Sequence, residues 1–388
     1  MEKLHRLIPC PAYEVKTMED WLADMAGEGL LLEKDGFFLG FAGFERSEPQ
    51  TVRYRLLPVQ KSGEEPDDDQ LRLCEKYGWE YVARRRDFYV FRSFDPDARE
   101  LNTDASVEAY ALRPVKKRQR SALISSLFYL LVYPLLVTRF CPLLTAVALG
   151  SFWTLMAFVW GLCMVIRELK AFRYLKALQS TLRESGSVPA PDWRKSRSHY
   201  LSARLFTFLL GLFLIVSFIG KRTDAVPLSQ YEGALPFATM ADLASEGSRD
   251  YRLTMSSISG SINTVEERSD FLAPLAVTYN EHATVKTAEG RMLDGGLYVE
   301  YIELRSPRLA EEALRELYRI DRFRHRYTPM EAPELDCDEV RAYMDNTHFP
   351  NLLIRKGNVA ARVMFYQTSE YKVPLEDWAA IVCDRLGA

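Results

Sequence analysis

Residues 122–138 read ALISSLFYLLVYPLLVT, and residues 141–166 read CPLLTAVALGSFWTLMAFVWGLCMVI. Neither stretch contains a charged residue. A third apolar stretch, LFTFLLGLFLIVSFIG at 205–220, can be extended back to residue 201 past the single Arg204. A helix needs about 20 apolar residues to cross a hydrocarbon core about 30 Å thick. We therefore predict three transmembrane helices, over about 122–138, 141–166 and 201–220, rather than buried helices of a soluble protein.

Charge divides the chain into three parts. The formal net charge is −8 over residues 1–112, +12 over 113–220 and −7 over 221–388, against −3 for the whole chain. A basic, apolar middle between two acidic parts is expected when the middle lies in a membrane and its rims face anionic lipid. The sequence predicts a multi-domain membrane protein: an α+β domain over 1–112, a membrane module over 113–220, and a tether with a second α+β domain over 221–388.

Basic residues near the span ends predict the orientation. Five precede the first span between residues 113 and 120, and eight lie between residues 167 and 197. The opposite side has Arg139, Lys221 and Arg222. Because cytoplasmic loops carry the excess of Lys and Arg, we expect a multi-pass protein of the cell membrane. Its N-terminal lobe and the loop 167–200 would be cytoplasmic, and its C-terminal lobe extracytoplasmic.

The predicted spans carry no chemistry of their own. None contains Asp, Glu, Lys or His near its middle, and such residues mark ion and proton paths. We therefore interpret the predicted spans as a membrane anchor rather than as part of a transporter or pump. Ala146, Gly150 and Thr154 are spaced four apart, a pattern that lets helices pack closely and makes a homo-oligomer one candidate arrangement.

The cytoplasmic loop is expected to continue the second span as an amphipathic helix up to residue 185. Apolar residues recur there at three- and four-residue steps: Leu169, Phe172, Leu175, Leu178 and Leu182. Two interpretations stay open. The basic face of this helix lies on anionic lipid or meets the acidic N-terminal lobe, or the helix packs on that lobe as an ordinary structural element.

The N-terminal lobe is expected to be α+β, with a helix that begins after Thr17 and carries Trp21. Strands are predicted at 30–33, 37–45 and 51–59, with a turn at 34–36 between the first two. A short helix is expected to end near Tyr77, and a hairpin over 79–84 and 88–94 turns around 85–87.

The order of several residues in this lobe resembles a bacterial family called domain of unknown function 2812. The resemblance covers roughly residues 1–95 and rests on Trp21-Leu22, Gly29-Leu30, Phe44, Tyr54-Arg55, Tyr77, Gly78-Trp79-Glu80-Tyr81-Val82 and Phe91. It implies a bacterial protein with an accessory or signalling role at the membrane. Members of this family are often followed by membrane spans and are commonly encoded near PadR-type transcription regulators. This neighbourhood makes a transcription regulator one candidate partner. The family offers no catalytic residues that could be carried over to this chain.

Arg84, Arg85 and Arg86 are a candidate surface for a cytoplasmic protein partner, because they lie at the predicted turn of a hairpin. The alternative is a solvated turn. The lobe is acidic overall, which argues against direct binding of nucleic acid.

The C-terminal lobe is expected to begin with a tether over 221–260, broken by Pro227, Pro236 and Gly247. Compact α+β structure follows: a strand over 296–304, a helix from 307, a hairpin over 351–356 and 359–366, and a closing helix over 374–386. Helices packed on an antiparallel sheet suit a small domain that binds a ligand or partner.

Arg319, Arg322, Arg324 and Arg326 form a basic cluster near the end of the helix predicted from residue 307. They are a candidate site for an anionic envelope polymer or a phospholipid head group. The alternative is a solvated helix terminus stabilised by the helix dipole. Cys337 and Cys383 are the only cysteines of this lobe, and the sequence leaves open whether they pair.

Signatures of enzymes and metal sites are absent from the sequence. There is no G-x-S-x-G or H-E-x-x-H motif and no zinc-type spacing of cysteines and histidines. We therefore expect no catalytic activity, metal or cofactor. The architecture favours a membrane-anchored sensor or regulatory adaptor. It would link an extracytoplasmic domain that binds an envelope ligand to a cytoplasmic domain that binds a protein. The alternative is a structural or assembly subunit of a membrane complex such as an exporter.

Overall fold

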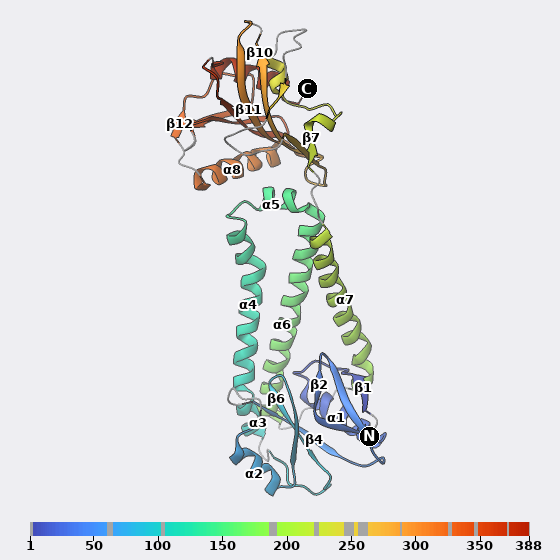
Figure 1. Ribbon diagram of the computed structural model, residues 1–388. Coiled ribbons are helices and arrows are strands. Elements are labelled where there is room, and N and C mark those ends of the chain that lie inside the picture. Colours follow the sequence, from blue (N-terminus) through green and yellow to red (C-terminus); the bar gives the residue numbers. More distant parts are fainter. Residues whose placement is uncertain are drawn as a thin grey trace. The chain divides into compact units, whose positions relative to one another are not determined.

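The computed structural model describes residues 3–59, 65–101, 105–185, 192–220, 225–243, 252–254, 263–287, 289–324, 328–344, 348–370 and 372–387. The chain forms a mixed α+β structure, as expected, with two compact units (Figure 1). One unit comprises Met1–Leu131 and Phe158–Phe213, and the other comprises Val132–Ala157 and Leu214–Ala388. Parts of the predicted tether, at 221–224, 244–251 and 255–260, and the loop residues 186–191 lie outside the described residues.

The described residues of the N-terminal lobe form two three-stranded antiparallel sheets and three short helices. The first sheet has the order β1 (Lys3–Leu7), β3 (Phe41–Arg46), β2 (Leu30–Phe38). The second has the order β4 (Arg53–Pro58), β6 (Phe88–Ser93), β5 (Glu80–Arg85). The helices are α1 (Val15–Gly27), α2 (Asp68–Lys76) and α3 (Ala105–Ala111).

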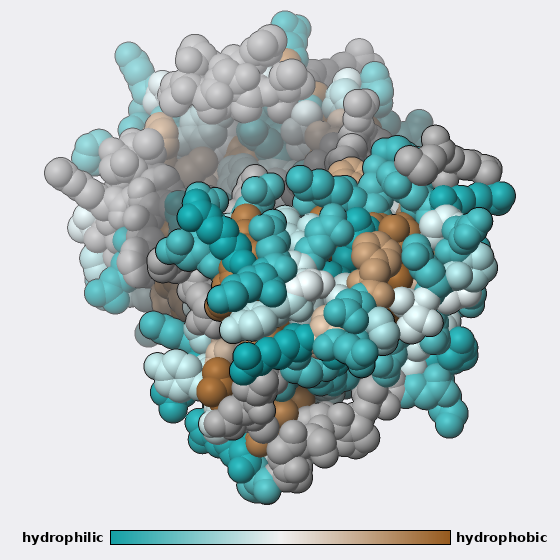
Figure 2. Space-filling model, turned by 90° about the horizontal axis from the view of Figure 1, so that it is seen from below, coloured by the Kyte–Doolittle hydropathy of each residue, from teal (hydrophilic) through white to brown (hydrophobic). Residues whose placement is uncertain are grey.

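Most of the aromatic residues that carry the family resemblance are core residues of this lobe. Trp21, Phe44, Tyr54 and Trp79 are each at most 2% exposed. Trp21 meets Phe44 edge to face, with 5.6 Å between ring centroids. The face seen in Figure 2 is mostly hydrophilic, with apolar side chains in small groups. These large aromatic residues therefore hold the lobe together.

The first hairpin differs from its prediction. A turn was expected at 34–36, but β2 runs through these residues to Phe38, and the hairpin turns at Leu39 and Gly40. The Lys34-Asp35-Gly36 sequence forms an irregularity in the ladder between Leu32 and Phe37. An extra loop of residues within a strand is tolerated as a bulge, so a turn-like sequence did not end the strand here.

Four helices follow the N-terminal lobe in the part of the chain that the structure describes: α4 (Arg113–Val137), α5 (Pro142–Leu149), α6 (Ser151–Ser185) and α7 (Trp193–Gly220). Two of them, over Ser151–Glu184 and Trp193–Ser217, are long and apolar enough to cross a membrane by length and composition. The prediction of one continuous span over 141–166 is wrong. Gly150 adopts φ +91°, and it separates the short helix α5 from α6. Glycine adopts such a conformation readily, and other residues rarely do.

The amphipathic end of α6 packs on the N-terminal lobe. Leu175, Leu178 and Leu182 are buried in the same hydrophobic core as residues of α1 and the strands. Gln179 donates to the backbone oxygen of Ala109 at 2.8 Å and accepts from Lys116 at 2.8 Å. Of the two interpretations left open for this helix, the described contacts support the second.

The C-terminal lobe is built on a nine-stranded antiparallel sheet. Its main path has the order β12-β13-β14-β15-β11-β10-β9-β7, and β8 pairs with β10. The strands are β7 (Val226–Pro227), β8 (Arg252–Leu253), β9 (Thr264–Arg268), β10 (Leu275–Lys286), β11 (Met292–Glu303), β12 (Thr328–Met330), β13 (Glu339–Met344), β14 (Pro350–Lys356) and β15 (Val359–Gln367). Two short 3-10 helices, Leu228–Gln230 and Met240–Leu243, lie among the early strands.

Helices α8 (Pro307–Arg324) and α9 (Leu375–Arg385) cover opposite faces of this sheet. Trp378 of α9 packs in one cluster with Ala361 and Val363 of β15, whereas α8 packs in another cluster with Ala360. Successive residues of a strand point to opposite faces of a sheet. The sheet therefore has two apolar faces, each covered by one helix.

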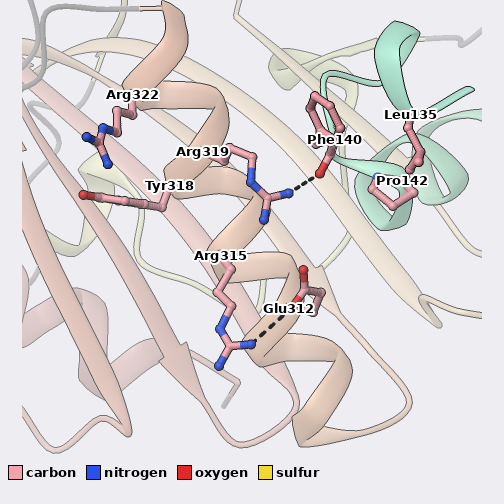
Figure 3. A pocket seen from close by; sticks show the side chains of 8 residues that line it. All are labelled: Leu135, Phe140, Pro142, Glu312, Arg315, Tyr318, Arg319 and Arg322. Carbon is pink, nitrogen blue, oxygen red and sulfur yellow. Dashed lines mark hydrogen bonds and ion pairs between the residues drawn. The ribbon is translucent and has the colours of Figure 1, made fainter. Parts of the chain in front are cut away.

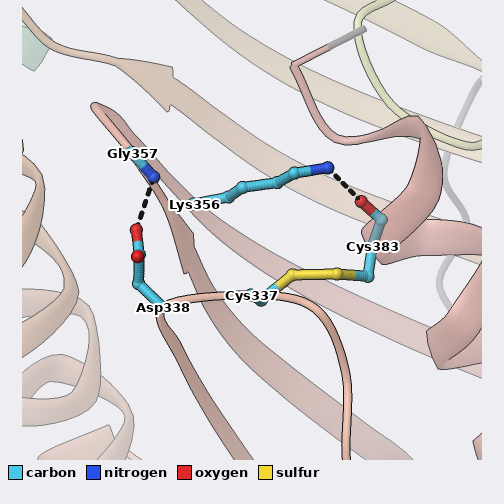
Figure 4. The surroundings of a disulfide bond; sticks show 5 residues. All are labelled: Cys337, Asp338, Lys356, Gly357 and Cys383. Carbon is cyan, nitrogen blue, oxygen red and sulfur yellow. Dashed lines mark hydrogen bonds between the residues drawn. A yellow bond between two sulfur atoms is a disulfide. The ribbon is translucent and has the colours of Figure 1, made fainter.

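A disulfide joins Cys337 to Cys383, with an S–S distance of 2.03 Å and a Cα–Cα distance of 6.6 Å (Figure 4). Lys356 donates to the backbone oxygen of Cys383 at 2.9 Å, and Asp338 accepts from the backbone of Gly357 at 2.6 Å. The bond ties the segment before β13 to α9. The pairing that the sequence left open is thus present in the structure.

Candidate anion-binding site beside helix α8

Helix α8 separates its apolar and basic residues onto different faces. It begins at Pro307, whose fixed backbone suits the first position of a helix. Ala310, Ala313, Leu314 and Leu317 are buried against the sheet. Arg315, Arg319 and Arg322 follow at steps of four and three residues, a spacing that places side chains on one face of a helix.

A hollow of about 920 Å³ lies beside this basic face (Figure 3). Three arginines from α8 contribute to its wall, and the segment from α4 to α5 contributes apolar residues. Its lining residues are Leu135, Phe140, Pro142, Glu312, Arg315, Tyr318, Arg319 and Arg322. We call this the α8 hollow.

The three arginines of the α8 hollow differ in their contacts. Arg315 forms ion pairs with Glu311 and Glu312, at 2.5 and 3.4 Å. Arg319 donates to the backbone oxygen of Phe140. Arg322 is exposed and has no ion-pair partner among the residues that the structure describes. The wall of the hollow therefore carries three guanidinium groups. Those of Arg315 and Arg319 are held by the contacts just described, and the N–H donors of Arg322 are available to a ligand.

Glu316 fastens α8 to α5. Its side chain is 1% exposed, and its carboxylate accepts from the backbone N–H groups of Leu143 at 3.1 Å and Leu144 at 2.8 Å. These N–H groups lie in the first turn of α5, where a helix leaves its donors without internal partners. Burial raises the pKa of Glu316, although these two donors and Arg319 act in the opposite direction.

Apolar contacts reinforce this attachment. Val147 of α5 belongs to the core cluster formed by α8 and the sheet, and Leu143 and Leu144 pack against the cluster. Helix α5 is thus part of the C-terminal lobe. The apolar residues that suggested a membrane span at 141–149 are explained by this packing.

Asp270 performs a similar role at the start of α6. Its carboxylate accepts from the backbone N–H groups of Ser151, Leu272 and Ala273. Burial raises the pKa of Asp270, but the three donors together outweigh burial and lower it. An anionic group at a helix N-terminus is stabilised by the helix dipole, so Asp270 caps α6 from the C-terminal lobe.

The four predicted anion-binding residues have different outcomes. Arg319 and Arg322 line the α8 hollow. Arg324 is the last residue of α8, and Arg326 lies outside the described residues. The sequence reasoning missed Arg315 and Glu316. The four-residue step from Arg315 to Arg319 was the available signal for the first, whereas nothing local to Glu316 indicates its partner on α5.

The predicted partner surface at Arg84, Arg85 and Arg86 is corrected in part. Arg85 is 6% exposed and donates to the backbone oxygen of Cys10 at 2.5 Å. Burial lowers the pKa of this guanidinium. Arg84 donates to the backbone oxygen of Arg86 at 2.9 Å, and Arg86 is exposed at the turn with φ +53°. Arg85 is therefore an internal residue, because alternate residues of a strand point inward.

The α8 hollow suits an anionic, partly apolar ligand. Guanidinium groups bind phosphate and carboxylate groups through paired N–H donors, and Leu135, Phe140 and Pro142 offer an apolar wall. Among the described residues, no group of three or more His, Cys, Asp or Glu side chains is arranged to hold a metal ion.

Comparisons with known proteins place one part of the chain in a family. No curated protein and no solved structure matches the chain. A family model matches the chain from Glu14, the residue before α1, to a position within α4, and the matched region includes the core residues Trp21, Phe44, Tyr54 and Trp79. It confirms the resemblance read from these residues. The N-terminal region of the chain, residues 14–124, matches the family described as Protein of unknown function (DUF2812).

Proposed function

We propose that this protein is a membrane-anchored sensor or regulatory adaptor. Its C-terminal lobe binds an anionic envelope ligand in the α8 hollow, and its N-terminal lobe engages a cytoplasmic protein. The observation that carries the proposal is the continuity of α6 over Ser151–Ser185. Asp270 of the C-terminal lobe caps its first residue, and Leu175, Leu178 and Leu182 near its end belong to the core of the N-terminal lobe. A continuous helix is a physical route by which one lobe can bias the other.

The membrane anchoring in this proposal is supported by exposure. In the most apolar 18-residue segments of α6 and α7, 6% and 0% of the residues are buried. Helices in the core of a soluble domain would be mostly buried. We propose α4 as the third span, because its apolar half carries exposed side chains such as Ile124, Leu131 and Leu136. Large exposed apolar surfaces on helices of this length fit a lipid environment.

The disulfide supports the proposed orientation. Disulfides persist in oxidising compartments and are rare in the cytosol. Cys337 and Cys383 are paired in the C-terminal lobe, whereas Cys10 and Cys74 of the N-terminal lobe are free. This distribution agrees with a C-terminal lobe outside the cell and an N-terminal lobe inside it.

Counting thiols tests this orientation. We expect the denatured protein from cells to react with four maleimide–polyethylene glycol groups without reductant and with six after reduction, because the chain has six cysteines and one disulfide. Gel shifts measure the number. In intact cells, an impermeant maleimide added with reductant is expected to label Cys337 and Cys383, and Cys141 of the same unit only when α5 opens, but not Cys10 or Cys74 of the N-terminal lobe. Labelling of six cysteines without reductant in the denatured sample would contradict an oxidising location.

Ligand binding at the α8 hollow is tested with the full chain in lipid nanodiscs. The probes are a short-chain phosphatidylglycerol and a glycerol phosphate oligomer, which represent a lipid head group and an envelope polymer. We expect Arg322→Ala to weaken binding of the preferred probe about tenfold to a hundredfold, because a hydrogen bond to a charged group contributes about 1.5–3 kcal/mol. Isothermal titration measures the affinity.

Arg308→Ala is the matched control for this experiment, since Arg308 is an exposed arginine of α8 outside the hollow. It is expected to leave the affinity unchanged. Equal effects of both changes would mean that the helix attracts anions only through its general charge, and the assigned site would be wrong. The better of the two probes then indicates whether lipid or polymer is the ligand.

Signalling is tested by affinity purification from crosslinked membranes. The full chain is compared with Asp270→Asn, a change that weakens the cap of α6. If the lobes are coupled through α6, the amount of cytoplasmic protein retained is expected to change with Asp270→Asn and with the probe that binds. Retention of membrane proteins alone, unaffected by either, would favour a structural subunit of a membrane complex.

A further inference from the structure

The turn between β2 and β3 presents large apolar side chains to the outside. Phe38 is 71% exposed, Leu39 is 76% exposed and Phe41 is 41% exposed. Leu7 of β1 is 43% exposed and lies opposite Phe41 in the ladder. Phe38 pairs with Phe41 across the hairpin, so these four residues form one group, which we call the apolar tip.

The apex of this turn has an unusual residue for its conformation. Leu39 and Gly40 adopt φ values of +44° and +91°. Two-residue hairpin turns with positive φ favour Asn, Asp and Gly, and a leucine in the left-handed region is uncommon. In water, a leucine at this position would be unfavourable for the backbone conformation and would gain nothing from burial of its side chain. In apolar surroundings, the side chain would be removed from water, which is favourable.

Helix α7 holds the apolar tip beside it. The Arg204 guanidinium donates to the backbone oxygens of Leu39 at 2.8 Å and Gly40 at 3.4 Å. A Cβ atom at position 40 would lie 1.8 Å from a guanidinium nitrogen of Arg204. Glycine at this position therefore permits the close approach of the hairpin to the helix, and both elements belong to the same compact unit.

The sequence of α7 gives the depth of this contact. Counting about 20 residues back from the end of α7 at Gly220, as a span requires, reaches Leu201. Arg204 then lies about one helical turn inside the span, at the boundary between head groups and hydrocarbon. Exposed apolar residues begin directly after it, at Leu205 and Phe206, and the exposed Arg197 precedes it. Arginine at this depth keeps its charge near the interface while its stem lies in apolar surroundings.

We propose that the apolar tip of the N-terminal lobe is inserted into the bilayer leaflet beside α7, with Arg204 fixing its depth. The inference rests on the proposed crossing of the membrane by α7. It goes beyond anchoring, because the tip gives the N-terminal lobe its own contact with lipid. Aromatic and leucine side chains are the residues that enter the boundary between head groups and acyl chains most favourably.

Depth-dependent quenching in vesicles tests this proposal. The full chain with Cys163→Ser is used, because the other free cysteines of the described residues are buried. A single cysteine is introduced as Leu39→Cys, labelled with NBD and reconstituted in vesicles of phosphatidylcholine and phosphatidylglycerol. Quenching is measured with doxyl-labelled lipids and with aqueous cobalt ions. Because Leu39 makes no core contact at 76% exposure, this change is not expected to disturb the fold.

Two further sites provide the comparison. Arg86→Cys lies at the exposed turn of the other hairpin of the same lobe, and Leu209→Cys lies on an exposed position of α7. We expect the label at position 39 to be quenched by doxyl lipids about twofold or more relative to the label at position 86, and to be shielded from cobalt. The label at position 209 is expected to be quenched by the lipid probes alone.

The outcomes separate the two proposals. If cobalt quenches position 39 while lipid probes quench position 209, the insertion of the tip is wrong and the membrane anchoring stands. If neither quencher reaches position 39, protein covers the tip, for example a second copy, and the insertion is again wrong. If lipid probes fail at position 209, α7 does not cross the membrane, and the anchoring falls together with the insertion.

Discussion

Arg362→Met is expected to destabilise the C-terminal lobe by about 3–5 kcal/mol, the cost of leaving a buried charge without its partner. Arg362 lies on β15, and its guanidinium contacts Asp321 of α8 at 2.5 Å and Glu300 of β11 at 2.9 Å. The side chain of Asp321 is 1% exposed. Methionine fills a similar volume but provides no positive charge, so the carboxylate of Asp321 would keep, among the described residues, the hydroxyl of Tyr343 as its partner.

The pKa of Arg362 shows how strongly its surroundings favour the charge. Burial lowers this pKa, but the carboxylates of Glu300 and Asp321 outweigh burial and raise it. The Arg362 guanidinium also lies over the ring of Tyr298, 5.4 Å from its centroid. The charge is therefore part of the packing between α8 and the sheet, and its loss affects the helix that carries the α8 hollow.

Thermal unfolding of the full chain in detergent, followed by limited proteolysis, measures this effect. We expect the C-terminal lobe to lose its protease resistance at a temperature roughly 10–15 °C lower than in the native protein. Arg355→Met is the control, since Arg355 pairs with the more exposed Asp338. Changing Asp321→Leu together with Arg362→Met is expected to recover part of the loss, because apolar side chains can replace a buried ion pair. A single variant as stable as the native protein would contradict the role given to the pair.

Glu316→Ala is expected to release α5 from α8. The change leaves the N–H groups of Leu143 and Leu144 without their acceptor in a partly buried position. Each buried donor that loses its partner costs about 1–3 kcal/mol. We therefore expect the docked state of α5 to lose about 2–4 kcal/mol relative to an open state.

Cys141 provides the measurement for this change. It is 2% exposed in the native structure and directly precedes α5. If α5 opens more often, the rate of maleimide labelling at Cys141 should rise about thirtyfold or more, because each 1.4 kcal/mol changes an opening equilibrium about tenfold. Glu312→Ala is the control, as Glu312 lies one turn earlier on α8 and its carboxylate pairs with Arg315. An unchanged rate in Glu316→Ala would show that apolar packing alone holds α5.

Local sequence signals predicted several regular elements of both lobes, but not β1, α3, β9 or β10. In the C-terminal lobe, the hairpin around Gly357-Asn358 and the closing helix appear as β14, β15 and α9. The Gly357-Asn358 turn lies between two short apolar runs, and both strands are buried on both faces of the sheet. The continuation of the second apolar stretch into an amphipathic helix was likewise predicted, and it appears in α6. These features depend on residues close together in the chain, which is why one sequence is enough to predict them.

The errors share a different cause. Uncharged residues at 141–149 have the composition of a span, but Val147 is buried against α8 and Glu316 caps the helix that contains it. Arg85 is of a residue type that usually lies at the surface, but its guanidinium donates to the backbone oxygen of Cys10 in the interior. In both cases the partner lies many residues away in the chain, and composition does not reveal it.

The sequence by itself determined the division by charge into two acidic parts and an apolar middle, the core aromatic residues of the N-terminal lobe, and the resemblance of this lobe to a family of unknown function that residues 14–124 match. Only the tertiary structure decided that Cys337 pairs with Cys383, that α5 docks on α8, and that Arg315, Arg319 and Arg322 line one hollow with Phe140. The physical reason is the range of the interactions. Periodicity and charge act within a few residues, whereas these contacts join segments that only the packing of the sheet and helices brings together.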